Sequence, residues 1–283
     1  MAEELNRKNY HSREMAMKYM SFSQFRDFEI CEVMALAEVK GEYERPKTDS
    51  LLYGSWVDEH FNGPEDEKAF IEENKDKLYS IKTGKMYAAF EGVQKTISFI
   101  ENYTNEEGEK ILLKYMSGQR QVIFTGLIAG VPFKSMIDSY FPGKCIVDGK
   151  VMKDFEKVWI ERDGKNIKVD FVEAYGYAIE GAVFQELEYQ NAKKSNPDAK
   201  KLYFILEPVT KEEIPNADLV IIDQEILDET LERIKEKAPR YQRIKMGLEK
   251  PVGCGKCPVC LSKKQIIRPQ MYSKIFLTEK EEE

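Results

Sequence analysis

The stretch RQVIFTGLIAGVPFKSMIDSYFPGKCIVDGKVMKDF, residues 120–155, decides the fold. Its apolar and β-branched residues form three short runs, separated at Ala129-Gly130 and at Pro142-Gly143. This pattern predicts three β-strands joined by two tight turns. Asp138 and Asp148 lie inside the second and third strands, among residues that otherwise suit a buried sheet. Because a buried carboxylate needs a partner, these two residues are the first candidates for a functional site.

The loop between the second and third strands determines how these acids face each other. A three-residue loop, 142–144, places Asp138 directly opposite Asp148, whereas a two-residue loop would send them to opposite faces. We expect the three-residue loop. Lys150 lies two residues after Asp148, so strand alternation puts both side chains on one face.

Two carboxylates about 5 Å apart across neighbouring strands repel each other unless a cation lies between them. Hard oxygen ligands favour Mg²⁺ or Mn²⁺. The ammonium of Lys150 could orient an attacking water or stabilise charge that develops on a phosphate. The alternative interpretation is that Asp138, Asp148 and Lys150 form an ion-pair ladder on a half-exposed sheet.

The spacing of Asp138 and Asp148-Gly149-Lys150 resembles the Asp…(Asp/Glu)-x-Lys signature of the PD-(D/E)XK nuclease superfamily. The wider stretch 130–155 is similar to the phage and prophage branch related to exodeoxyribonuclease VIII and lambda-type exonuclease. The resemblance implies an α/β fold with a restriction-endonuclease-like αβββαβ core and a mixed sheet, wrapped by additional N- and C-terminal helices. It also implies a Mg²⁺-dependent exonuclease that degrades linear double-stranded DNA from its ends and leaves a single strand for an annealing protein.

A helix expected from Ser50 to Asn62 carries His60. In the exonucleases that the chain resembles, a histidine on a helix after a glycine stands at the metal site, and Gly54-x5-His60 is similar to that element. The resemblance therefore implies that His60 joins Asp138 and Asp148 as a catalytic and metal-binding residue. The alternative is a structural histidine. Asp58 flanks His60, but helical geometry turns it away from the face of His60, so it is left out of the expected site.

A further helix is expected from 170 to 195. In the superfamily this helix carries a glutamine with a tyrosine four residues later, but here the matching positions are Glu180 and Phe184. Glu180 could ligate a metal or position water, although such an i, i+4 pair is also typical of ordinary packing. Gln185 is the nearby polar alternative. The departure also leaves open a DNA-binding or assembly module that keeps the fold but lacks catalysis.

The C-terminal segment GCGKCPVC contains Cys254, Cys257 and Cys260, whose spacing lets three thiolates converge on one metal centre. The layout resembles that of iron–sulfur PD-(D/E)XK nucleases, which implies that Cys31 supplies the fourth ligand of a [4Fe-4S] cluster. The last gap is shorter than in those helicase-associated enzymes, so zinc stays an alternative. The layout also leaves open a single-strand nuclease that acts with a helicase. We expect Cys31 to lie on one long helix that begins at Ser21 or Ser23.

The 283-residue chain is expected to form a single nuclease domain. Its parts are a helical segment 1–117, a catalytic core 118–210, a C-terminal helix with the cysteine cluster 211–275, and an acidic tail 276–283. Within the core, a short edge element is expected at 157–160 and a buried strand at 202–206 beside the hairpin. An edge strand at 218–222 and a helix over 223–245 follow.

Charge and hydropathy limit the partners. The formal net charge is −7, yet residues 233–274 contain twelve Lys or Arg against two Glu. This segment could contact phosphates or be a solvated face. No apolar run approaches the ~18 residues of a membrane span, and the start lacks a signal-peptide core, so we expect a cytoplasmic protein. Its expected partners are linear duplex DNA ends, an annealing protein and, as in related ring-forming exonucleases, copies of itself.

Overall fold

The computed structural model describes residues 4–162, 164–266, 269 and 271. Its largest sheet has five strands in the order β1-β2-β3-β6-β7. The bounds of these strands are β1 (Gln119–Ile128), β2 (Val131–Phe141), β3 (Cys145–Met152), β6 (Tyr203–Thr210) and β7 (Val220–Ile221). β3 and β6 run parallel and the other neighbours antiparallel, so the sheet is mixed.

The hairpin of β2 and β3 has the expected three-residue loop. Ser139 pairs with Val147, and Phe141 with Cys145. Continuing this register by one residue places Asp138 opposite Asp148. The ladder itself stops at Ser139, so the two strands begin to separate at the carboxylates. The acids therefore lie where the sheet opens.

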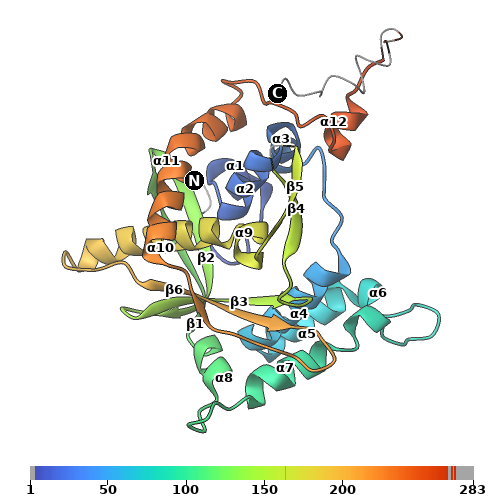
Figure 1. Ribbon diagram of the computed structural model, residues 1–283, viewed down its shortest axis with the longest axis vertical. Helices are drawn as coiled ribbons and strands as arrows, with labels where there is room; N and C mark the ends of the chain where they lie inside the picture. The colour runs from blue at the N-terminus through green and yellow to red at the C-terminus, as the bar shows by residue number, and fades with distance from the viewer. Residues whose placement is uncertain (1–3, 163, 267–268, 270, 272–283) are drawn as a thin grey trace.

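Helices cover both faces of the sheet (Figure 1). One layer contains α1 (Arg13–Lys18), α2 (Phe22–Ile30), α3 (Glu32–Lys40), α9 (Phe171–Tyr175), α10 (Tyr177–Ser195) and α11 (Gln224–Lys245). The opposite side carries α4 (Asp49–Asn62), α5 (Pro64–Glu73), α6 (Lys75–Leu78), η1 (Ala88–Phe90), α7 (Val93–Asn102) and α8 (Ile111–Met116). Two apolar cores result, one on each face of the sheet.

The αβββαβ core is present. The helix α10 follows the β1–β3 meander and leads into β6, which lies beside β3 as expected. Phe184 of α10 packs edge-on against Phe204 of β6, with ring centroids 6.2 Å apart. Burying aromatic side chains of this size stabilises the helix on the sheet by about 2 kcal/mol each. This packing fixes the position of α10, and with it Glu180, above β3.

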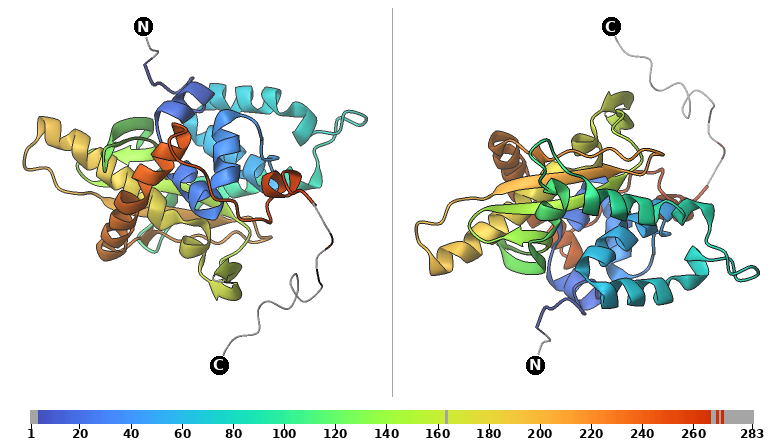
Figure 2. Two further views of the ribbon diagram at one scale, coloured as in Figure 1. Left: turned by 90° about the horizontal axis from the view of Figure 1, so that it is seen from above. Right: turned by 90° about the horizontal axis from the view of Figure 1, so that it is seen from below.

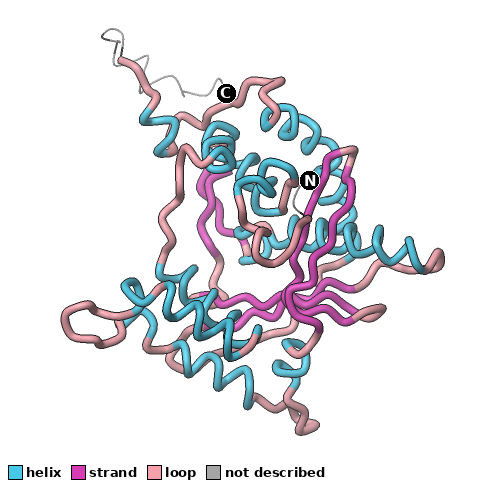
Figure 3. The backbone as a smooth tube through the Cα atoms, turned by 180° about the vertical axis from the view of Figure 1, so that it is seen from behind, coloured by secondary structure: helices cyan, strands magenta, loops and turns pink. Residues whose placement is uncertain are grey.

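Three local predictions were wrong. The expected long N-terminal helix is broken into α2 and α3 at Cys31, whose backbone is extended. The expected helix over 170–195 is divided at Gly176. The single edge element at 157–160 is instead a separate hairpin of β4 (Val158–Arg162) and β5 (Lys165–Val169), which stands apart from the larger sheet (Figure 3). The acidic tail, 276–283, lies outside the described residues.

The C-terminal part of the chain folds back over the N-terminal helices. α11 lies beside α2, and α12 (Pro258–Ser262) lies beside α3 (Figure 2). The Tyr241 ring of α11 stacks on Phe28 of α2 with centroids 5.1 Å apart. Lys237 of α11 also donates to Glu29 at 2.8 Å. Aromatic packing and ion pairs thus hold the two ends of the fold together.

Candidate active site

A cavity of about 570 Å³ lies between α4, α10 and the strands β3 and β6. Its lining includes four acids and a lysine that come from five different elements, α4, β2, β3, α10 and β6: Asp58, Asp138, Lys150, Glu180 and Glu207. These residues are far apart in the sequence, so only the fold brings them together. A second, smaller cavity shares Asp138, Lys150 and Glu180, so the three form a wall between two hollows.

Asp148 and Lys150 project from the same face of β3, as strand alternation requires. The Nζ of Lys150 forms an ion pair with Oδ2 of Asp148. Only 2% of Asp148 is exposed, so this pair is screened little by solvent. The structure therefore places Asp138, Asp148 and Lys150 together, and the surface-ladder interpretation does not fit the burial of Asp148.

Glu180 of α10 completes this group from above the sheet. Lys150 Nζ lies 3.2 Å from both Oε1 and Oε2 of Glu180, which is 2% exposed. Gln185, the polar alternative, lies elsewhere: its amide donates to Leu202 O and to Gln224, both at 2.8 Å. Glu180 is thus the residue of α10 that contacts the other candidates.

The balance of charge favours a cation. With Asp138, Asp148 and Glu180 all ionised, three carboxylates would face one ammonium and leave a formal charge of −2 in a buried space. Burial raises the pKa of Asp138 to about 7, and the negative charge of Asp148 contributes to the rise. Burial raises the pKa of Asp148 to about 7 as well, with a contribution from Glu180. A divalent cation would relieve this repulsion, so the residues present fit a Mg²⁺ or Mn²⁺ site.

The pKa of Lys150 is shifted so that its charged form is favoured, unlike the pKa values of Asp138 and Asp148. Burial lowers its pKa, but the charges of Asp148 and Glu180 outweigh the burial and hold the pKa well above its ordinary value. Lys150 is therefore an ammonium at neutral pH. It can donate hydrogen bonds and stabilise negative charge, but it cannot accept a proton.

Asp58, which the sequence analysis left out, lies at the cavity. It is one helical turn after Gly54, and both residues line the hollow. Its Oδ1 accepts a hydrogen bond from Arg120 Nη2 at 2.7 Å. Burial raises the pKa of Asp58, and the negative charge of Asp138 raises it further. The spacing Gly54-x3-Asp58 is the sequence signal that would have identified this residue.

His60 is turned to the other side of α4. Its Nδ1 lies 2.8 Å from Glu67 Oε2 and its Nε2 lies 3.3 Å from Glu101 Oε1. It lines neither of the cavities that contain Asp138. The structure does not bring His60 to the other candidates, because a residue six positions after Gly54 is rotated away from the face that Gly54 and Asp58 share.

Glu207 is a second residue that the sequence analysis missed. It is 1% exposed on β6, opposite Gly149, and within the described residues neither of its carboxylate oxygens has a hydrogen-bond partner. Burial raises its pKa to about 8. A charged residue inside the apolar run YFILEPV was the available signal, because buried carboxylates are costly unless they have a role.

Several basic side chains of α11, which forms the first part of the basic C-terminal segment, are paired in the fold. Arg233 and Lys237 approach Glu29, and Arg240 forms two hydrogen bonds of 2.9 Å with Glu32. Lys245 is 2% exposed and donates to Tyr19 O at 2.9 Å. These side chains hold α11 against α2 and α3, so they are not a free surface for phosphates.

The four candidate cysteines do come together. The sulfur atoms of Cys31, Cys254, Cys257 and Cys260 all lie within 4.8 Å of one another. The fifth cysteine, Cys145, lies on β3 and is half-buried, outside this group. Such a set of four thiol ligands can hold a metal centre.

A family model described as a PDDEXK-like domain of unknown function (DUF3799) matches residues 21–263. The chain belongs to this family. The matched range includes every residue of the cavity discussed above and all four clustered cysteines. The PDDEXK-like fold expected from the Asp138, Asp148 and Lys150 pattern is thus confirmed.

A solved structure agrees. The PDDEXK-like chain is similar to a crystal structure from Eubacterium rectale described as a "Putative exonuclease", with a TM-score of 0.83 and 32% sequence identity over 98% of this chain and 99% of that chain. No curated protein matches the sequence. Within the described residues, no helix is long and apolar enough to cross a membrane.

Proposed function

We propose that this PDDEXK-like chain is a metal-dependent deoxyribonuclease that hydrolyses phosphodiester bonds from the ends of linear double-stranded DNA. The observation that carries the proposal is the buried group of Asp138, Asp148 and Glu180 around Lys150, beside an open cavity. Its phage-type recombination role, with a single-strand annealing protein as partner, rests on the sequence resemblance.

Asp138 and Asp148 would hold Mg²⁺ or Mn²⁺, with Glu180 as a third oxygen donor. When bound, the ion supplies Lewis-acid stabilisation of the negative charge that develops on the phosphate. His60 is not part of this proposal, because it faces Glu67 and Glu101.

The other side chains of the site bind the phosphate and orient the reacting groups. Lys150 stays protonated, so it donates to a phosphate oxygen or to the attacking water and adds positive charge at the reacting centre. Glu180 holds the ammonium in place at 3.2 Å. Asp58 lines the neighbouring wall of the cavity, and the hydrogen bond that it accepts from Arg120 at 2.7 Å keeps its carboxylate oriented.

The test compares three DNA substrates: an end-labelled linear duplex, a covalently closed circle and a single strand. The wild type should degrade the linear duplex with Mg²⁺ and leave the circle intact. Lys150→Ala should bind DNA but release no label, since the ammonium is lost.

Two other outcomes would replace the proposal. Faster degradation of the single strand than of the duplex indicates a nuclease that acts with a helicase. DNA binding without cleavage by the folded wild type indicates a non-catalytic DNA-binding module.

A further inference from the structure

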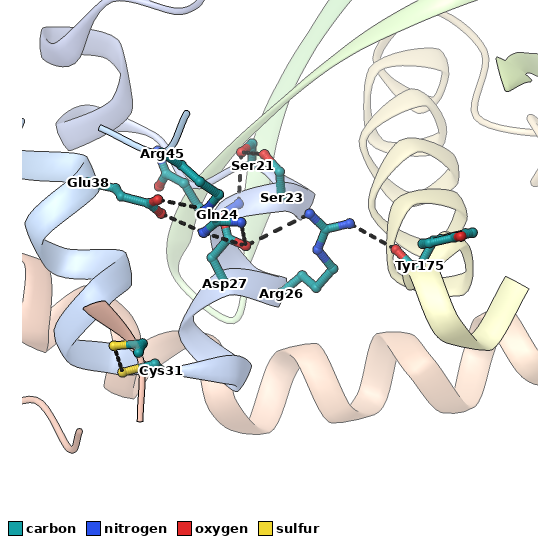
Figure 4. Close-up of polar contacts among 10 residues, drawn as sticks. Ser21, Ser23, Gln24, Arg26, Asp27, Cys31, Glu38, Arg45 and Tyr175 are labelled. Atoms are coloured by element: carbon teal, nitrogen blue, oxygen red, sulfur yellow. Dashed lines mark hydrogen bonds and ion pairs between the residues drawn. The ribbon is translucent and has the colours of Figure 1, made fainter. Parts of the chain in front are cut away.

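The geometry of the four clustered cysteines distinguishes between metal centres. The Sγ of Cys31 lies 3.7 Å from the Sγ of Cys257 and 3.6 Å from that of Cys260. No pair of sulfurs in the set is farther apart than 4.8 Å. Figure 4 shows the sulfur of Cys31 joined by a dashed line to a second sulfur atom.

These distances correspond to one small ion. Zinc binds thiolates at about 2.3 Å in a tetrahedron, which places the sulfurs about 3.8 Å apart. In a [4Fe-4S] cluster each cysteine ligates a different iron at the corner of a cube, so the sulfurs lie about 6 Å apart. The spacing in this chain fits the first arrangement and is too short for the second.

We propose that Cys31, Cys254, Cys257 and Cys260 hold a single structural Zn²⁺ ion instead of the iron–sulfur cluster that the resemblance implies. The proposal does not depend on the nuclease activity, because it concerns a site built from other residues. The metal joins residue 31 to residues 254–260 and so fastens the C-terminal segment to the N-terminal helices.

The backbone around the sulfurs is arranged to support thiolates. The amide of Cys257 donates to the sulfur of Cys254 at 3.3 Å, and the amide of Cys260 donates to that of Cys257 at 3.4 Å. The amide of Cys254 donates to the sulfur of Cys31 at 3.4 Å. Hydrogen bonds of this kind favour the ionised form of the sulfur that accepts them.

Two glycines allow the chain to approach this closely. Gly255, between the first two clustered cysteines, has φ +75°, a conformation that other residues rarely adopt. A Cβ at Gly253 would lie 2.9 Å from the sulfur of Cys260. Glycine at these two positions therefore lets the loop hold its cysteine sulfurs close together.

Cys31 explains why α2 and α3 are separate helices. It ends α2 and begins α3 in an extended conformation, and its side chain makes no capping hydrogen bond. Ser, Thr, Asp or Asn would cap α3 better. Metal binding accounts for a thiol at this junction. The extended backbone at Cys31 interrupts the helix and lets the sulfur turn toward residues 254–260.

The metal bound at Cys31 would also support one wall of the cavity that contains Asp138 and Lys150. Arg26 of α2 lines the cavity and donates to Tyr175 O at 2.9 Å (Figure 4). A metal at Cys31 fixes the C-terminal end of the same helix. Loss of the metal should therefore loosen α2 as well as the C-terminal loop.

The experiment measures the metal content of the full chain produced in iron-rich, zinc-poor medium and purified without oxygen. We expect about one zinc per chain, no acid-labile sulfide and no absorption band near 400 nm. Cys145→Ser is the matched control, because its thiol lies outside the group, and it should keep the zinc. Cys260→Ser should lose it.

Replacing the zinc by Co²⁺ gives a second, spectroscopic readout of the ligand set. Four thiolates around one Co²⁺ ion should produce intense visible absorption bands typical of a tetrahedral site, and Cys145→Ser should produce the same bands. Iron with a matching amount of sulfide in the purified protein, or a chain that is folded and free of metal, would overturn the proposal. So would bands that signal a site other than a tetrahedral one.

Discussion

Lys150 of β3 and Glu180 of α10 form a buried ion pair, with the ammonium nitrogen 3.2 Å from both carboxylate oxygens. The pair connects β3 to the helix that covers it. In the superfamily that the sequence resembles, a glutamine is expected on this helix. A glutamate places a full negative charge against the lysine, which raises the lysine pKa instead of leaving it unchanged.

Glu180→Gln should lower DNA cleavage by about 10- to 100-fold, because Lys150 loses one of the groups that hold it. The same change removes a negative charge, so the pKa of Lys150 should fall. We expect the alkaline limb of the pH–rate profile to move to lower pH. Glu186→Gln is the control and should leave the profile unchanged, because Glu186 lies on the same helix, accepts a hydrogen bond from Gln190 at 2.7 Å and lines neither cavity.

Asp58→Asn should reduce cleavage by about 10- to 100-fold, since it removes a carboxylate from the cavity and the partner of Arg120. His60→Asn should retain wild-type cleavage, because His60 lies against Glu67 and Glu101 and lines neither cavity. Initial rates on one linear duplex compare the two variants. A large loss in His60→Asn with normal folding would restore the role that the family resemblance implied for this histidine.

Glu207→Gln should make the protein more stable at alkaline pH. The pKa of Glu207 is about 8 in the fold and 4.5 in the unfolded chain. Between these values the unfolded state releases a proton that the folded state keeps, so the free energy of unfolding falls as the pH rises. At pH 8.5 the variant should gain at least about 1 kcal/mol in urea unfolding, and at pH 4 it should gain nothing.

The control for this prediction is Glu213→Gln, an exposed residue that follows the same strand. It should not change the pH dependence. If Glu207→Gln destabilises the protein equally at pH 4 and pH 8.5, the carboxylate has a partner in solution. The burial of Glu207 then does not lower the free energy of unfolding at alkaline pH.

The hairpin could be predicted from the sequence because its signals are local. The alternation of Met136, Asp138 and Tyr140 defines one face, and the Pro142 turn sets the register that brings Asp138 to Asp148. The same register explains why the short pattern of Asp138, Asp148 and Lys150 predicted the family fold. Glu180 could be placed near the site for a similar reason, since helix α10 must cover the hairpin.

The remaining site residues depend on contacts that the sequence does not reveal. Asp58 and His60 lie two positions apart on one helix, and only the packing of α4 decides which of them faces the cavity. Glu207 follows an apolar run that predicts an ordinary buried strand, and its position beside the cavity depends on how β6 pairs with β3. The break at Cys31 was missed because nothing in the local propensity of residues 28–34 ends a helix there; the contact with residues 254–260 does.

The measurement that tests the central claim most directly is release of label from an end-labelled linear duplex in the presence of Mg²⁺. It compares the wild type with Asp148→Asn, and Asp198→Asn is the control, since Asp198 is exposed and lines neither cavity. The wild type and Asp198→Asn should degrade the duplex, while Asp148→Asn should release no label and keep its circular dichroism spectrum. Equal release by Asp148→Asn, or none by the folded wild type, would contradict the assignment of the active site to Asp138, Asp148 and Lys150.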